Sequence, residues 1–217
     1  MIIDDPSRRS PAPSQPACPP DTVRAVVDAL SRTMLARDPY THDHQLRVAD
    51  LCVAIATELR LPPLRVEGLR LAALIHDIGK IALPAETLTK PTPLAEHETL
   101  ALRGHVATGL AILGGQRWPW AIARTLQQHH ERLDGSGYPD GLRGDQIGDD
   151  ARILAVADTV EAMASDRPYR HARGLEAALG ALRAGRGTGF DPRVVDACQR
   201  LFRSGAYRFP RDQAVRR

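Results

Sequence analysis

The sequence predicts an all-α fold built as a single domain. Apolar residues recur at helical spacing along most of the chain, and no stretch shows the strict alternation of apolar and polar residues that marks a strand. At 217 residues the chain is long enough for one domain with a substantial core, and it contains no internal repeat. These three observations together favour a packed bundle of helices.

Composition excludes several classes of protein. The 29 Lys and Arg against 26 Asp and Glu give a net charge of +3, spread without a basic stripe for nucleic acid. No apolar run approaches the roughly 18 residues of a membrane span, and the N-terminus lacks a secretory pattern. The cysteines Cys18, Cys52 and Cys198 form no CxxC pair, which argues against disulfides and a thiolate zinc site. We expect a cytoplasmic protein that binds neither DNA nor membranes.

The two ends of the chain differ from its middle. Residues 1–20 contain six prolines, which block helix and remove amide donors, so we expect a disordered tail there. Residues 211–217 are expected to form a flexible basic C-terminus. The folded domain is therefore predicted to span residues 21–210.

The first two helices follow from caps and apolar spacing. The first is expected to begin after Asp21, as its N-cap, and to end at about Arg37. The second begins at Thr41, as its cap, and ends before the prolines at 62–63. His44 lies in its first turn.

A central helix is expected over residues 65–78, which are apolar on almost every side. It ends with the adjacent pair His76 and Asp77, and Gly79 is suited to a left-handed C-cap. Three prolines then punctuate residues 81–95, which we expect to form a loop.

The later helices complete the expected bundle, with a Gly-rich and Asp-rich loop at 134–148. His105 lies in the middle of the first of them. Their expected ranges are 95–113, 120–130, 150–165, 174–184 and 191–203.

Seven polar residues stand at helix ends or inside apolar helices, where each needs a partner: His44, His76, Asp77, His105, His129, His130 and Asp158. One such histidine alone is more often a hydrogen-bonded core residue than a metal ligand. The set is hard to explain by packing, however, and imidazole with carboxylate but no Cys suits iron, manganese, cobalt or catalytic zinc. The other histidines, His42, His97 and His171, are expected at the surface.

The order of these residues resembles the HD-GYP family of cyclic di-GMP phosphodiesterases. The match covers most of residues 38–195 and includes the run from His76 to Lys80, the run from His129 to Glu131, the Asp-Gly-Ser-Gly-Tyr-Pro loop at 134–139 and Arg167-Pro-Tyr-Arg170. A His-Asp pair alone is weak evidence, but the ordered set with this loop is specific.

The resemblance implies an HD-superfamily helical domain with two, in some members three, metal ions. The first ion is expected on His44, His76, Asp77 and Asp158. Asp77 is expected to bridge to a second ion, whose further ligands are His105, His129 and His130. In members with a third ion, a Glu stands four residues before the first ligand, where this chain has Tyr40. We therefore expect two ions.

Further residues are implied to act on the substrate. Asp77 and Lys80 are the expected catalytic residues, Lys80 by contacting the scissile phosphate, although a surface lysine at a helix C-terminus is the alternative. Arg167 and Arg170 match positions that hold the dinucleotide, with solvated charges on a turn as the alternative. Tyr138 is implied to be a further substrate-binding residue with a structural role beside the pocket, and its loop is implied to contact diguanylate cyclase domains.

Three smaller expectations concern residues outside the ligand set. Glu131 is expected to hydrogen-bond a ligand histidine. Trp118 and Trp120 are expected to pack in the core rather than to stack on bases. The glycines at 135 and 137 are expected to permit a tight loop.

The expected function is metal-dependent hydrolysis of cyclic di-GMP to pGpG, and more slowly to GMP, by a hydroxide that bridges two iron or manganese ions. The alternative is a catalytically weak regulatory module that acts by binding diguanylate cyclase domains or other signalling proteins. A different HD-type nucleotide hydrolase is a third reading, which the Gly-Tyr-Pro loop disfavours. The oligomeric state stays open, with a homodimer as one option.

Overall fold

A computed structural model describes residues 18–166 and 172–210, and every regular element in these ranges is a helix. The only strand-like pairs there are two isolated bridges, Asp134 with Arg143 and Arg186 with Phe190. The all-α prediction is therefore confirmed. The elements are α1 (Pro20–Arg37), α2 (Pro39–Glu58), α3 (Pro63–Leu74), η2 (Ile78–Ala82), α4 (Ala85–Thr89), α5 (Glu96–Arg103), α6 (His105–Leu113), α7 (Ile122–Gln128), η3 (Gly144–Gln146), α8 (Asp149–Ala164), α9 (Leu175–Ala184) and α10 (Pro192–Ser204).

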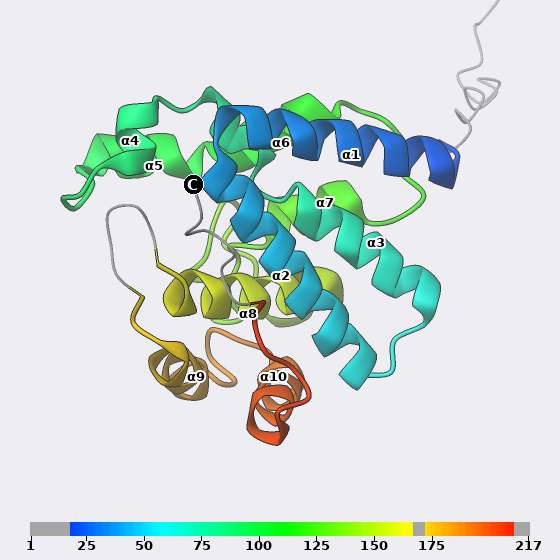
Figure 1. Cartoon of the computed structure of the whole chain (residues 1–217), viewed down its shortest axis with the longest axis vertical. Coiled ribbons are helices and arrows are strands. Elements are labelled where there is room, and N and C mark those ends of the chain that lie inside the picture. The colour runs from blue at the N-terminus through cyan, green and yellow to red at the C-terminus, as the bar shows by residue number, and fades with distance from the viewer. Residues whose placement is uncertain (1–17, 167–171, 211–217) are drawn as a thin grey trace, which may run out of the picture.

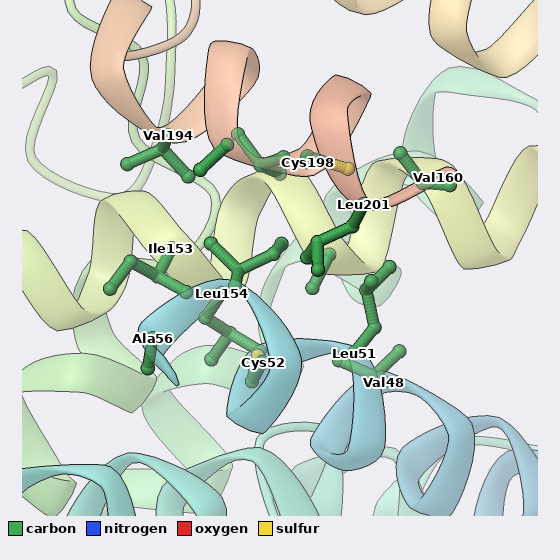
Figure 2. Packing of buried hydrophobic residues seen from close by; sticks show 14 of the residues in the cluster. Val48, Leu51, Cys52, Ala56, Ile153, Leu154, Val160, Val194, Cys198 and Leu201 are labelled. Atoms are coloured by element: carbon green, nitrogen blue, oxygen red, sulfur yellow. The ribbon is translucent and has the colours of Figure 1, made fainter. Parts of the chain in front are cut away.

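Helices α2 and α8 pack against each other, and α3 contributes buried residues to both of two apolar cores (Figure 1). The C-terminal core joins α2 and α8 to α9 and α10, and Figure 2 shows side chains of α2, α8 and α10 meeting there. The N-terminal core joins α1, α3, η2 and α7, and Trp118 and Trp120 pack against it, as expected. Burying each large apolar side chain in these cores stabilises the fold by about 1.5–3 kcal/mol. No described helix combines the length and apolar character needed to cross a membrane.

The starts of the first two helices differ from the prediction. Helix α1 begins at Pro20, and Asp21 lies in its first turn rather than at the cap, because the fixed φ of proline suits a first helical position. At the start of α2 the cap is Asp38, whose carboxylate accepts hydrogen bonds from the Thr41 amide at 3.1 Å and hydroxyl at 2.6 Å. Thr41 is therefore the partner of the cap.

The central helix is shorter than expected, and this positions the His-Asp pair. Helix α3 ends at Leu74, so His76 and Asp77 lie in the turn between α3 and η2. Gly79 is not a left-handed C-cap but a residue of η2. A Cβ atom there would lie 1.9 Å from the backbone oxygen of His105, so the glycine is required for the close approach of η2 to α6.

The segment between η2 and α6 contains more helix than predicted. Residues 81–95 include the short helix α4, and the expected helix 95–113 is divided at Gly104 into α5 and α6. His105 is consequently the first residue of α6 rather than a mid-helix residue. No residue of α4 or α5 is buried, and the two helices form a projecting corner of the molecule (Figure 1).

Candidate metal centre

Asp77 occupies the middle of a buried cluster of histidines. Its Oδ1 lies 3.3 Å from Nε2 of His105, while its Oδ2 lies 3.4 Å from Nε2 of His76 and 3.7 Å from Nε2 of His44. The carboxylate is therefore shared by two sets of donor atoms that could each hold a metal ion. One set is His44, His76 and Asp77, and the other is Asp77, His105, His129 and His130.

Three of the histidines are oriented by their own helical turns. Nδ1 of His76 donates to the carbonyl of Ala73 at 2.8 Å, and His105 and His129 make the same contact with the carbonyl three residues earlier, both at 2.6 Å. Because a carbonyl only accepts, the hydrogen lies on Nδ1 and the lone pair on Nε2 faces the cluster. This arrangement leaves each imidazole ready to bind a cation.

The histidine Nε2 atoms indicate whether the cluster suits a metal ion. Those of His44, His76, His105 and His129 are all buried and make no hydrogen bond with described residues. A buried polar atom without a partner costs about 1–3 kcal/mol, so four together require an explanation. A divalent cation provides one, because neutral imidazole nitrogen and carboxylate oxygen are its usual ligands.

The protonation of four of the five histidines in the cluster agrees with that reading. Burial lowers the pKa of His76 and His105, although Asp77 opposes the shift, and it holds the pKa of His129 well below its usual range. Burial likewise lowers the pKa of His130 to about 3. These four imidazoles are therefore neutral at pH 7, as a metal ligand must be.

His44 is held by charged side chains instead of a carbonyl. Its Nδ1 donates to the carboxylate of Glu161, which also accepts from Nε of Arg47 at 2.6 Å, and its Nε2 lies 3.2 Å from Oδ1 of Asp158. Burial opposes protonation of His44, but the neighbouring carboxylates of Asp158 and Glu161 raise its pKa to about 9. Burial similarly opposes ionisation of Glu161, while His44 and Arg47 lower its pKa to about 2.

Sequence reasoning missed Glu161, although a signal was present. Glu161 follows Asp158 by three residues in an apolar helix, which places both carboxylates on one face of α8. It also missed Gln45. With its amide oxygen toward Asp77, buried Gln45 accepts from the Asp77 amide at 3.1 Å and donates to the Leu74 carbonyl at 3.3 Å, fixing the turn that carries the His-Asp pair.

Lys80 connects the cluster to a cavity. Its Nζ lies 2.5 Å from Oδ2 of Asp77, and its largely buried side chain lines an opening of about 470 Å³ that also reaches His44. Burial opposes ionisation of Asp77, but the nearby positive charge of Lys80 favours it. The pKa of Asp77 therefore stays well below its usual range. Tyr40 and the loop around Thr92 form the far wall of the cavity.

The Gly-Tyr-Pro loop borders the cluster on its other side. The ring of Tyr138 stacks on that of His130, with centroids 4.6 Å apart. Gly135 adopts a φ of +79°, and a Cβ atom on Gly137 would lie 2.4 Å from Cα of Glu131, so both glycines permit the tight loop, as expected.

Glu131 does not contact a ligand histidine, so that expectation is wrong. Its buried carboxylate instead accepts hydrogen bonds from the backbone amides of residues 140, 141 and 142 at 2.7, 3.1 and 3.0 Å. The carboxylate therefore closes the loop that follows the histidine pair, because these amides would otherwise lack partners.

The remaining predicted positions are distributed outside the cluster. His97 is exposed, as expected, and His42 is partly buried with its Nδ1 3.3 Å from Asp43. His171, Arg167 and Arg170 lie outside the described residues. The structure thus brings the five candidate histidines together with Asp77 and Asp158, which are separated by up to 114 positions in the chain.

Comparison with known proteins agrees with this geometry. The family model described as HD domain matches residues 28–194 of the 217-residue chain. The chain belongs to the HD domain family. Membership in this family explains the helical fold and implies a site for divalent metal, which the His/Asp cluster of this HD domain is able to hold.

Individual relatives refine the comparison. The chain is 42% identical over 82% of its length to the cyclic di-GMP phosphodiesterase response regulator RpfG of Xanthomonas campestris, covering 47% of that protein. It is 36% identical over 87% of its length to 3'3'-cGAMP-specific phosphodiesterase 3 of Vibrio cholerae, covering 41% of it. The chain therefore spans less than half of the length of either relative.

A solved structure shares the fold. Bd1817, an HDG"Y"P protein from Bdellovibrio bacteriovorus, superposes with a TM-score of 0.64 over 84% of this chain and 64% of its own. Because the identity is 16%, this similarity shows the helical architecture alone. The arrangement of the helices is thus shared more widely than the residues they carry.

Proposed function

We propose that this HD domain is a metal-dependent phosphodiesterase that hydrolyses cyclic di-GMP to pGpG. The observation that carries the proposal is Asp77, whose two oxygens face two separate sets of histidine nitrogens. Such sharing suits a pair of metal ions held close together, which is the arrangement used to displace an alkoxide from a phosphodiester. The name of the similar protein RpfG, a cyclic di-GMP phosphodiesterase, supports the choice of substrate.

The proposed ligands follow the expectations from sequence. His44, His76, Asp77 and Asp158 would hold one ion, and Asp77, His105, His129 and His130 the other. Iron and manganese suit this donor set. When bound, the two ions would supply Lewis acidity and a water of lowered pKa. Tyr40 offers a phenol where a third ion would need a carboxylate, so we propose two ions and slow conversion of pGpG to GMP.

The protein's own residues orient and stabilise the reacting groups. Lys80 lies between Asp77 and the cavity, so its ammonium can donate to a non-bridging phosphate oxygen as negative charge develops there. Tyr138 supports the ring of His130 by stacking and thereby fixes one wall of the site. Arg167 and Arg170 are proposed to bind the dinucleotide on the strength of the family resemblance.

We also propose the domain bounds, the compartment and the protein partners of this enzyme. We take residues 21–210 as the HD-GYP domain, with residues 1–20 and 211–217 as its flanking tails. Cys18, Cys52 and Cys198 are free, as is usual in a reducing compartment, so a cytoplasmic site of action is proposed. Contact with diguanylate cyclase domains and homodimer formation are further proposals, to be tested by co-purification and by the measured mass in solution.

A second substrate has specific support, because similar proteins of Vibrio cholerae are named 3'3'-cGAMP-specific phosphodiesterases.

The test is a time course of manganese-loaded or iron-loaded protein with each dinucleotide, resolving the products by chromatography. We expect metal-dependent pGpG from cyclic di-GMP and a lower kcat/KM for cGAMP. Turnover of cGAMP alone would replace the substrate, whereas metal binding without any turnover would favour the regulatory module.

A further inference from the structure

Arg103 ends α5 at the edge of the metal centre, two residues before His105. Its guanidinium carbon lies 5.0 Å from the centroid of the Tyr138 ring, and the Tyr138 ring in turn stacks on that of His130 with centroids 4.6 Å apart. The two rings are inclined by only 24°. The contacts of Arg103 with Tyr138 and of Tyr138 with His130 therefore link an exposed guanidinium to a candidate metal ligand.

Arg103 differs from the other cations around the site in having no polar partner among the described residues. Lys80 is paired with Asp77, while Arg132 donates to backbone carbonyls on either side of His130. Arg103 is exposed and makes no hydrogen bond or ion pair with any described residue. Its N–H donors are thus unused, although the aromatic face fixes the position of the group.

Guanidinium chemistry indicates what those donors would bind. The planar fork of N–H groups matches two oxygens of a phosphate, and stacking on an aromatic ring leaves the edge of the fork exposed. Pre-ordering on Tyr138 also reduces the side-chain entropy lost when a ligand is bound. A lysine at this position would supply the charge without the fork.

We propose that Arg103 binds the second phosphate of a cyclic dinucleotide whose first phosphate lies at the metal centre. The inference rests on the proposed function, because a cyclic dinucleotide presents a second phosphodiester beyond the one at the metal centre. Tyr138 is then the platform for this contact. Arg103 would distinguish cyclic dinucleotides from phosphodiesters that carry a single phosphate.

The test compares two substrates in the metal-loaded full chain. The wild type, Arg103→Ala and Arg103→Lys are assayed with cyclic di-GMP and with bis(p-nitrophenyl) phosphate, which has one phosphate. For Arg103→Ala we expect KM for cyclic di-GMP to rise by about tenfold or more, since a charge-assisted hydrogen bond is lost, and the ratio of the two kcat/KM values to fall accordingly. Arg103→Lys should recover part of the loss.

A matched control is available at the end of another helix. Arg203 is also exposed and lies in the last turn of α10, on the opposite side of α8 from α5 (Figure 1). Arg203→Ala removes the same charge and should leave the substrate ratio unchanged. Equal losses on both substrates, a loss of bound metal, or the same effect in the control would overturn the assignment of Arg103.

Measurements on the wild type test the proposed function separately from the proposed contact of Arg103. Equilibrium dialysis with a phosphorothioate analogue of cyclic di-GMP measures binding without turnover. If the wild type binds the analogue but does not cleave cyclic di-GMP, only the enzymatic proposal fails, and weaker binding by Arg103→Ala still supports the contact. If the wild type does not bind the analogue, both proposals are wrong.

Discussion

The C-terminal core and the metal centre both include residues of α2 and α8, but they are stabilised in opposite ways. In the core, Leu51 of α2 and Leu154 of α8 are fully buried among other apolar side chains (Figure 2). In the centre, His44 of α2 and Asp158 of α8 face each other with little access to water. Apolar burial stabilises the fold without any ligand, whereas the centre contains desolvated charges and unpaired nitrogens. The core therefore supports a site that is unfavourable until it binds cations.

The largest effect is expected from Asp77→Ala. Removing the shared carboxylate should abolish metal loading and reduce hydrolysis to background, because both donor sets lose a ligand. The core does not depend on Asp77, so the variant should remain helical. Metal analysis, product chromatography and circular dichroism check these outcomes, and turnover at the wild-type rate would refute the assigned centre.

The complementary change in the core is Leu154→Ala. It should reduce the free energy of unfolding by about 2–5 kcal/mol through lost burial and the cavity left behind, while metal stoichiometry stays at the wild-type value. Leu64 is 66% exposed, so Leu64→Ala is the matched control and should change stability by less than about 0.5 kcal/mol. Loss of metal from the core variant would show that the two regions are not separable.

Chelation tests the comparison without mutation. If the ions bind only the folded protein, metal at 100 times its dissociation constant adds about 2.7 kcal/mol of stability. EDTA should therefore lower the Tm of the wild type and of Leu154→Ala alike, with no effect on Asp77→Ala. An unchanged Tm in the wild type would mean that the cluster does not bind metal under these conditions.

Glu161→Gln is expected to weaken the centre rather than to destroy it. The glutamine keeps a hydrogen bond to His44 but removes the charge that orients the ring and pairs with Arg47. Changes to such supporting partners cost about 10–100-fold in metal affinity. Competition with a fluorescent chelator measures the affinity. Exposed Glu176 provides the control Glu176→Gln, and equal affinities in all three proteins would contradict a positioning role for Glu161.

The smallest effect concerns the margin of the C-terminal core. Burial opposes ionisation of Asp191, but hydrogen bonds from Arg193 and Arg152 lower its pKa. A lowered folded pKa means that the stabilisation exists above the unfolded pKa, near 3.9, and is lost as pH falls through the folded value. Asp191→Asn replaces the charged partner of Arg152 and Arg193 by a neutral amide, so it should be about 1 kcal/mol less stable at pH 7, and the difference should vanish in acid.

Urea unfolding at a series of pH values measures this dependence. Metal is removed beforehand so that the histidines of the centre do not contribute through bound ions. A difference between Asp191→Asn and the wild type that stays constant from pH 7 to pH 3 would show that the carboxylate acts without its charge.

Much of the fold could be predicted because helix formation depends on local pattern. The predicted ranges for α8, α9 and α10 lie within one or two residues of those observed, since apolar spacing and flanking Gly or Pro residues mark them directly. The errors arose where tertiary contacts decide the backbone. Gly79 is required by the approach of α6, and the predicted long helix 95–113 is divided at Gly104.

The candidate site could likewise be predicted only in part from the sequence. Residue types alone indicated the histidines, Asp77 and Asp158, because ionisable groups in apolar helices need partners wherever they lie. Glu161 was missed and Glu131 was misplaced, since periodicity gives the face of a helix on which a side chain lies but not what that face meets. The contact of Glu161 with His44 joins positions 117 residues apart.

The sequence by itself determined the helices and the chemistry of the donor atoms, because both depend on residue type and on spacing within a few turns. Only the tertiary structure decided that Asp77 faces two sets of histidines and that Arg103 lies over Tyr138 beside them. These relations depend on how α6 packs against η2 and α7 and on where the loop after α7 lies. Packing brings together residues that are distant in the chain, and a local sequence pattern does not indicate which distant residues will meet.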